Sequence, residues 1–296
     1  MKKLSLLLVL MMLLGIVPAR AEETLTFLGV TVEKDATYLD MGDVFIEDLY
    51  AFGDFLRELP ALEKVDMFAT PVTRPVIDAI VENFPNIEFG WTINIAADHY
   101  IRTDATAFST LHGNCGGHSS ADFEVLKYCK NLRALDIGHN SVVSLEFLRN
   151  LPQLRVLILA DNPVYYLTPL EDLKELEYLE LFSCNFRDIS VLSELPHLMD
   201  LNISNNPELY QYNNLLTLTP TLRRLWISNI GSIISEGRYY ELQGMYPDAT
   251  IVCWGEPTDN GWREGEHYET IYEIFHTGEY RPFSDSFPFE EENPTE

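Results

Sequence analysis

Apolar positions recur with a fixed period through the middle of the chain. The segment Leu132–Asn140 carries leucine or isoleucine at its first, fourth and sixth positions and asparagine at its ninth. The same arrangement begins again at Leu154, Leu176 and Leu198, so successive copies lie 22 residues apart, and a further copy begins at Leu222 after 24 residues. Apolar and polar residues alternate in the first half of each copy, which predicts a short strand. A period of this length, kept over several copies, predicts stacked structural repeats.

The second half of each copy has a different spacing. After Asn140, apolar residues return at every third position, at Val142, Leu145, Leu148 and Leu151. This spacing predicts a 3₁₀ or short helical turn, because side chains at i and i+3 eclipse one another there. Each unit is therefore expected to contain a strand, a corner and a helical turn. One unit cannot fold alone, because its apolar face needs a neighbouring unit to cover it.

The ninth position of each copy carries a small polar residue. An amide at this corner can accept from and donate to backbone groups that would otherwise have no partner. A cysteine can replace the amide as a small buried group. We therefore expect a structural ladder, rather than a catalytic role, for Asn140, Asn162, Cys184 and Asn206.

The repeat pattern, L-x-x-L-x-L-x-x-N/C with a Phe186-x-Asp188-Ile189 corner, resembles the internalin-type leucine-rich repeat of bacteria. The resemblance is close over residues 122–230. It implies an α/β leucine-rich-repeat solenoid, which is a right-handed arc with a parallel β-sheet on its concave face and 3₁₀ or short helical turns on its convex face. It also implies that the protein recognises another protein.

Departures from the pattern set the expected domain limits. Residues 22–254 are predicted to form the solenoid, with an irregular or hairpin insertion over about residues 96–121. The aromatic segment 255–283 is predicted to cap the open end, because the terminal units of a solenoid need a different covering face. The acidic tail, residues 284–296, is expected to be disordered.

The first 21 residues have the layout of a secretory signal. Lys2 and Lys3 precede an apolar run from Leu4 to Val17, and small residues follow. This layout predicts a signal peptide over residues 1–21 with cleavage after Ala21, and hence a secreted, extracellular protein. The alternative is a membrane anchor, but a span needs about 20 apolar residues. We expect no transmembrane anchor in the mature chain.

The insertion contains the spacing of a candidate metal or nucleophile site. His112, Cys115 and His118 lie three residues apart, with Asp122 or Cys129 as a fourth metal ligand. A Cys/His pair is also a candidate nucleophile, and export would permit a Cys115–Cys129 disulfide. The Gly- and Ser-rich surroundings favour an ordinary loop, so no metal site is assigned here.

The outward positions of the strands predict a binding surface. When the first, fourth and sixth positions of a copy are buried, the third, fifth and seventh point outward from the concave face. Aromatic and arginine side chains on a rigid sheet suit a protein interface; the alternative is an ordinary surface with scattered apolar residues. The predicted partner-binding set is Asp136, Ile158, Tyr178, Glu180, Phe182, Asp200, Asn202, Arg224 and Trp226.

Composition narrows the class of function. The 296 residues include 46 Asp and Glu against 20 Lys and Arg, which gives a formal charge of −26. This charge argues against nucleic-acid binding, because phosphate contacts need a basic surface. Phosphate-binding glycine loops and the GxSxG, HExxH and EF-hand motifs are absent from the sequence, so no cofactor is expected. The sequence therefore predicts an exported, non-enzymatic, monomeric module that binds an unknown protein.

Two other functions stay open at this point. A secreted metal-dependent or hydrolytic factor would use the His112, Cys115 and His118 insertion. A carbohydrate-binding surface protein would use aromatic residues of the cap, whose helical and turn spacings nevertheless favour core packing. These residues are Trp262, Tyr268, Tyr272, Phe275 and Tyr280.

Overall fold

The computed structural model describes residues 23–96, 99–111, 116–256, 258 and 260–286. The predicted signal peptide with its cleavage site at Ala21, and residues 287–296 of the tail, lie outside these ranges. Within them, no helix combines the length and the apolar character needed to cross a bilayer. The chain divides into two compact units, one containing residues up to 70 together with 79–89, and the other containing 71–78 together with 90 onward.

The smaller unit begins with an antiparallel hairpin of β1 (Thr24–Phe27) and β2 (Val30–Glu33). Strand β3 (Tyr38–Asp40) pairs in parallel with the start of β4 (Lys64–Val72). Helix α2 (Leu49–Arg57) lies between them in sequence and begins at Asp48, whose carboxylate accepts two backbone N–H groups of the first turn. The apolar side chains of this segment are therefore presented by an α-helix and not by a 3₁₀ turn.

Three elements cross from one unit into the other along the chain: β4, α3 (Arg74–Asn83) and β5 (Glu88–Ala96). Within the larger unit, β5 pairs antiparallel with β6 (His99–Arg102). This hairpin falls in the region where the repeat pattern of the sequence breaks.

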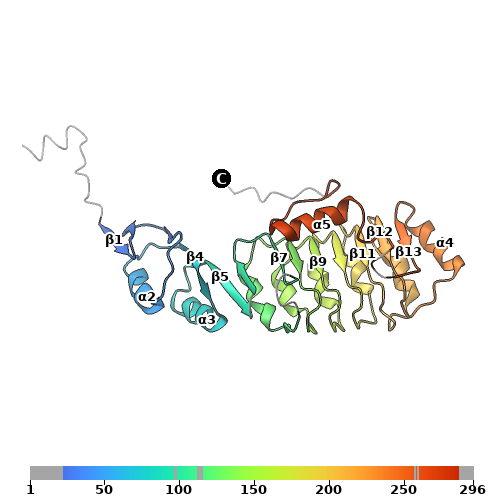
Figure 1. Ribbon diagram of the computed structural model, residues 1–296, viewed down its shortest axis with the longest axis horizontal. Coiled ribbons are helices and arrows are strands. Elements are labelled where there is room, and N and C mark those ends of the chain that lie inside the picture. Colours follow the sequence, from blue (N-terminus) through green and yellow to red (C-terminus); the bar gives the residue numbers. More distant parts are fainter. Residues whose placement is uncertain (1–22, 97–98, 112–115, 257, 259, 287–296) are drawn as a thin grey trace, which may run out of the picture. The chain divides into compact units, whose positions relative to one another are not determined.

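A 7-stranded parallel sheet forms the inner face of the larger unit, with its strands in sequence order (Figure 1). Equivalent positions of adjacent strands lie side by side, as Leu135 does with Leu157 and Leu179 with Leu201. The strands are β7 (Ala107–Ser109), β8 (Ala134–Asp136), β9 (Val156–Ile158), β10 (Tyr178–Glu180), β11 (Asp200–Asn202), β12 (Arg224–Trp226) and β13 (Thr250–Val252).

Between most of these strands the chain returns through a 3₁₀ turn. The last return, between β12 and β13, contains the α-helix α4 (Glu236–Met245) instead. The regular alternation of parallel strand and 3₁₀ turn confirms the leucine-rich-repeat solenoid. The turns are η1 (Asp122–Tyr128), η2 (Glu146–Asn150), η3 (Thr168–Asp172), η4 (Ser190–Glu194) and η5 (Tyr212–Thr217).

The corner after each of the strands β8 to β11 is a left-handed backbone position followed by a buried Asn or Cys side chain. His139 and Asp161 have φ values of 56° and 55°, and the same position repeats along the solenoid. The next residue in each copy links two repeats: the Asn162 carboxamide oxygen accepts the Val142 N–H at 2.9 Å, while its nitrogen donates to the Ile137 carbonyl at 2.8 Å. Cys184 takes this place in the next copy, with its thiol 3.5 Å from the Leu159 carbonyl. These bonds satisfy backbone groups that the corner turns away from the strand ladder.

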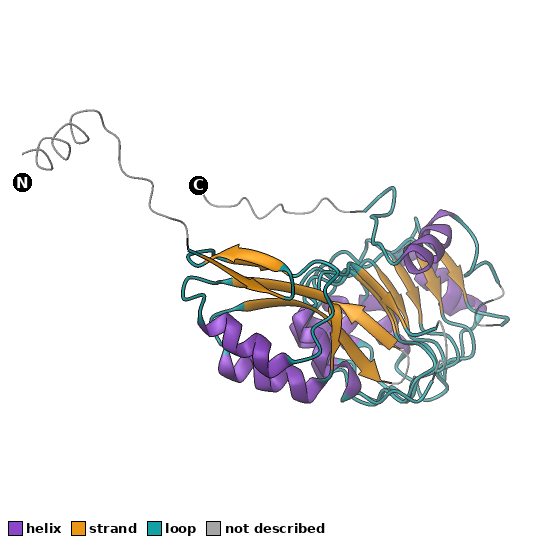
Figure 2. Ribbon diagram, turned by 60° about the vertical axis from the view of Figure 1, so that its left-hand side comes forward, coloured by secondary structure: helices purple, strands orange, loops and turns teal. Residues whose placement is uncertain are grey.

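The segment predicted to cap the open end lies elsewhere. Helix α5 (Glu266–Thr277) contacts β7 and β8, and it lies over the strands in Figures 1 and 2. The expectation of an end cap over 255–283 is therefore corrected: from Gly261 onward the chain covers the concave face. The reason is apolar burial, because the outward side chains of the strands and the inward side chains of this segment form one hydrophobic cluster. Its members include Ala134, Val156, Tyr178, Trp226, Trp262, Ile271, Ile274 and Phe283.

Candidate functional site: the concave face and its C-terminal cover

The concave face is the surface that the sequence singles out, and residues 261–286, here named the C-terminal cover, lie across it. The predicted partner-binding residues were expected to be exposed. In the folded chain only Arg224 keeps intermediate exposure, and the others are buried. The expectation of an open concave face is thus wrong, because the protein's own C-terminal segment occupies much of it.

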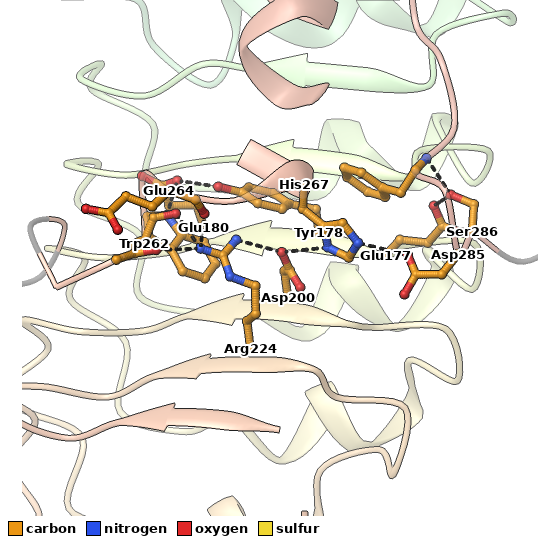
Figure 3. A network of polar contacts seen from close by, with 12 residues as sticks. Glu177, Tyr178, Glu180, Asp200, Arg224, Trp262, Glu264, His267, Asp285 and Ser286 are labelled. Carbon is orange, nitrogen blue, oxygen red and sulfur yellow. Dashed lines mark hydrogen bonds and ion pairs between the residues drawn. The ribbon is translucent and has the colours of Figure 1, made fainter. Parts of the chain in front are cut away.

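Trp262 is the central contact of the cover. Its side chain is 0% exposed and its ring lies 5.3 Å from both the Tyr178 and the Trp226 rings, measured between centroids. The indole nitrogen donates to the Glu180 carboxylate at 2.8 Å, as Figure 3 shows. A buried tryptophan whose N–H is satisfied in this way combines a large apolar contact with a directional anchor.

Glu180 is a buried carboxylate on β10. Its Oε2 atom accepts the Trp262 indole N–H and also the Tyr178 hydroxyl, at 3.1 Å. Burial raises the pKa of this carboxyl, the two hydrogen bonds oppose that rise, and the charge of Asp136 adds to it. Burial and then Glu180 also raise the pKa of the Tyr178 phenol well above its usual value, which keeps the phenol a hydrogen-bond donor.

Arg224 on β12 holds the first turn of the cover. Its guanidinium pairs with Asp200 at 2.9 Å and donates to backbone carbonyls of the cover, including that of Gly261 at 2.9 Å. It also lies over the Trp262 ring, 4.6 Å from the centroid. One side chain therefore satisfies carbonyls that lie outside regular secondary structure and packs against the anchoring indole.

His267 joins the sheet to the far end of the cover (Figure 3). Its Nδ1 lies 3.1 Å from Asp200 and its Nε2 lies 2.8 Å from Asp285, while its ring packs on Phe283. Burial alone lowers the pKa of this imidazole, but the hydrogen bonds and charges of Asp200 and Asp285 outweigh that effect and raise the pKa to about 9. The side chain is therefore a cation at neutral pH and bridges two carboxylates.

The last described residues are also fixed to the sheet. The Ser286 hydroxyl donates to Glu177 at 2.8 Å, and the Tyr280 N–H donates to the Thr106 hydroxyl at 2.9 Å. The prediction of disorder over 284–296 is therefore wrong for Asp285 and Ser286, while residues from 287 lie outside the described part of the chain. Apolar burial holds the cover against the sheet, and each of these hydrogen bonds also fixes where on the sheet it lies.

The structure contains a buried ion pair beneath the cover that the sequence analysis did not predict. Arg155 and Glu177, both at the second position of their copies, pair at 3.2 Å with side chains that are 1% and 0% exposed. The parallel register places these positions next to each other on adjacent strands, and the Glu177 N–H donates to the Arg155 carbonyl. Opposite charges at equivalent positions of consecutive repeats would have been a usable signal.

The cover leaves part of the concave face open as a cavity. Its volume is about 240 Å³, and it lies between the β7–β10 side of the sheet and α5. Four residues of the predicted binding set line it: Asp136, Ile158, Glu180 and Phe182. The other members of that set, Tyr178, Asp200, Asn202, Arg224 and Trp226, do not line it.

The histidines of the insertion form a hydrogen-bonded pair where they are described. His118 Nε2 lies 2.9 Å from His99 Nδ1, and His99 Nε2 lies 3.1 Å from the Thr110 carbonyl. Because a carbonyl only accepts, His99 Nε2 carries a proton and His118 donates to His99 Nδ1 in the neutral pair. Burial and then His99 lower the pKa of His118. His112 and Cys115 lie outside the described residues.

The described cysteines are buried thiols. Cys129, Cys184 and Cys253 are free, and burial raises the pKa of the Cys129 thiol to about 12. Such a thiol is a poor nucleophile, because the thiolate is the reactive form. Within the part of the chain that the structure describes, no group of 3 or more His, Cys, Asp or Glu side chains is placed to hold a metal ion.

No protein-family model matches the sequence, and no curated protein matches it. Among solved structures, the chain is similar to an internalin C2 of Listeria monocytogenes, with 22% identity over 52% of this chain and 76% of that chain and a TM-score of 0.37. A second internalin of that species shows 15% identity over 78% and 85% of the two chains, with a TM-score of 0.39. A leucine-rich-repeat protein of Leptospira interrogans shows 15% identity over 68% and 62%, with a TM-score of 0.36. These similarities concern the fold.

Proposed function

We propose that the chain is an exported, non-enzymatic module that binds a protein partner at the open part of its concave face. The observation that carries the proposal is the cavity beside the C-terminal cover, into which successive repeats present Asp136, Ile158, Glu180 and Phe182. These side chains stand on a rigid parallel sheet, so little conformational freedom is lost when a partner binds. The layout of residues 1–21 supports export, and the repeat spacing supports a bacterial, internalin-type protein.

The way the sheet holds its own cover supports this function. Buried Trp and Tyr rings, together with an arginine that satisfies backbone carbonyls, fix a segment that has no strand pairing with the sheet. Protein–protein interfaces concentrate their binding energy in the same residue types. The concave surface therefore has the chemistry to hold a polypeptide, and the cavity is the portion still accessible to another chain.

Other functions have weaker support. A metal-dependent or hydrolytic site in the insertion would need His118, whose imidazole is buried against His99. A sugar platform built on the cap aromatics would need Trp262, whose side chain is buried against the sheet. The charge of −26 opposes a nucleic-acid partner. We propose a monomer, because the cover removes apolar concave surface that a second copy could otherwise bury.

Affinity capture with matched variants tests the proposal. The mature chain is immobilised and exposed to the extracellular medium of the source culture or host, and the retained proteins are compared with those retained by Phe182→Asp and by Tyr166→Asp. Phe182 lines the cavity, whereas Tyr166 is exposed and lies near η3 on the convex side. A partner at the cavity should lose at least about tenfold in affinity with Phe182→Asp and keep it with Tyr166→Asp. Equal retention by all three proteins would refute binding at the cavity.

A further inference from the structure

Glu180, which lines the cavity, has one carboxylate oxygen that accepts no hydrogen bond from the described residues. Glu180 is only 5% exposed, and both of its hydrogen bonds, from Trp262 and Tyr178, go to Oε2. Among the described residues nothing donates to Oε1 and no cation pairs with it. A buried carboxylate gains stability from each further hydrogen bond or cation that it accepts, so Oε1 marks a position that a positively charged group would complete.

A second buried carboxylate adds to the negative potential at the same place. Asp136 lines the cavity and is 2% exposed. Its oxygens accept from the Gly138 N–H at 3.1 Å and the Ser109 hydroxyl at 3.0 Å. Its charge acts on Glu180, whose pKa burial and this repulsion raise. A cation entering the cavity would relieve that repulsion.

The walls of the cavity are apolar and aromatic. Ile158 and Phe182 come from the sheet, and Ile271 and Phe275 come from α5. The exposed Tyr272, also on α5, lines the cavity as well. Aliphatic stems bury well against such walls, and aromatic rings also attract cations.

We propose that the cavity is a recognition site for a primary ammonium group on a short apolar stem, supplied by a lysine side chain of the protein partner. This inference rests on the proposed function. The ammonium binds Oε1 of Glu180, the Asp136 charge assists it, and the stem lies between Phe182 and α5. A cavity of about 240 Å³ accommodates such a side chain but not a folded element.

The hydrogen bonds of Glu180 favour lysine over arginine. A guanidinium binds a carboxylate best when both oxygens are available for two parallel bonds. In this site Oε2 already accepts from Trp262 and Tyr178, so only Oε1 remains. One available oxygen matches the compact charge of an ammonium better than the planar fork of a guanidinium.

Arg263 provides a way to determine the sign of the ligand charge. It lines the cavity, is exposed, and its charge lowers the pKa of Glu180. Among the described residues its guanidinium has no hydrogen bond or ion pair. A cationic ligand therefore meets repulsion from Arg263, whereas an anionic ligand would be attracted by it. Arg263→Gln should strengthen ammonium binding and would weaken the binding of an anion.

The test uses n-butylammonium as a mimic of the lysine stem, with n-butanol and n-butyrate as neutral and anionic counterparts. Binding to the mature full chain is followed by the NMR signal of the Trp262 indole N–H, which donates to Glu180. We expect butylammonium to bind at least about tenfold more tightly than either counterpart. Glu180→Gln should remove that preference, and Arg263→Gln should increase the affinity by about twofold to fivefold.

Two controls keep the outcome decisive. Asp35→Asn changes the net charge by the same amount as Glu180→Gln at an exposed residue of the smaller unit, and should leave binding unchanged. If Glu180→Gln does not fold, the exposed Arg263→Gln variant still tests the site. Equal binding of butylammonium and butanol, or butyrate binding that weakens with Arg263→Gln, would overturn the proposal.

Partner binding separates this inference from the proposed function and identifies the source of the ammonium. If Phe182→Asp lowers the affinity for a captured partner and Glu180→Gln does not, the proposed function stands and the lysine site is refuted. If Glu180→Gln lowers the affinity for the partner and butylammonium competes with the partner for the wild-type protein, both proposals are supported. If butylammonium binds but acetylation of the partner's lysines leaves its affinity unchanged, the site takes a free amine and the lysine assignment is wrong.

Discussion

The indole N–H of Trp262 donates to the carboxylate of Glu180 at 2.8 Å across a separation of 82 residues in the sequence. This bond joins the C-terminal cover to the centre of the concave sheet. It also defines which oxygen of Glu180 is left for a ligand. Residues of the cover therefore determine which side chains of the concave face are buried and which atoms remain available to a ligand.

Trp262→Ala should destabilise the larger unit by about 3–5 kcal/mol, because it removes a fully buried aromatic side chain and leaves a cavity. The measurement is equilibrium urea unfolding. Trp254→Ala is the matched control: that ring is 58% exposed, so its loss should change the stability by about 0.5 kcal/mol or less. Equal stability of the two variants would show that the cover contributes little to the fold.

His267 should make the stability depend on pH in the alkaline range. Its pKa is raised from 6.5 to about 9 in the folded protein by Asp200 and Asp285, with Arg224 sharing Asp200. A raised pKa means that the folded state holds the proton more tightly than the unfolded state. Its stabilising contribution is therefore complete below pH 6.5 and is lost as the pH rises through about 9.

Thermal unfolding across this pH range checks the role of His267. The wild-type midpoint should fall between about pH 7 and about pH 9.5, and His267→Asn should lower the midpoint at neutral pH and flatten the curve. His276→Asn changes an exposed histidine of the same helix and should keep the wild-type slope. A wild-type slope in His267→Asn would show that another group causes the pH dependence.

Asn162→Ala should cost about 3 kcal/mol, because it leaves the buried Val142 N–H without its acceptor and removes one of the two amide donors to the Ile137 carbonyl. Asn162→Cys should cost less, since Cys184 holds the equivalent place in the next repeat through its thiol and the Leu159 carbonyl. Urea unfolding measures both variants. Asn185→Ala, on an exposed residue, should be nearly neutral, and a comparable loss there would contradict the ladder.

Arg155→Met should destabilise the protein by about 3–5 kcal/mol, because it leaves Glu177 buried without its cation. Replacing both residues, as Arg155→Met with Glu177→Gln, should recover much of that loss, since the buried Glu177 charge is then gone and Glu175, the other carboxylate that pairs with Arg155, is 43% exposed. A double-mutant cycle by urea unfolding measures the coupling. Additive losses would show that the two charges do not interact in the folded state.

The repeat could be predicted because its signal is local. Positions such as Leu135 and Leu157 occupy adjacent strands as a direct result of the 22-residue period, and the corner after each strand follows from the same spacing. The place of the cover could not be predicted in this way. The contact between Trp262 and Glu180 has no periodicity, and the apolar residues of α5 would look the same on an end cap as on the concave face.

The candidate site was predicted in part for the same reason. Strand alternation correctly placed Asp136, Ile158, Glu180 and Phe182 on one face, where they line the cavity. It could not show that Tyr178, on the same face, is buried by the C-terminal cover. The outward positions of a strand are exposed only when nothing folds over them, and that depends on residues far along the chain.

The cover has a consequence for how the solenoid loses its structure. In an array whose repeats contact only their neighbours, the terminal repeats can fray while the others stay folded. Here one segment binds Thr106 beside the first strand of the sheet and Arg224 on the sixth, through Tyr280 and Gly261 respectively. Opening the early repeats therefore loosens a segment that the late repeats also hold, so the repeats between them should melt as a single cooperative block.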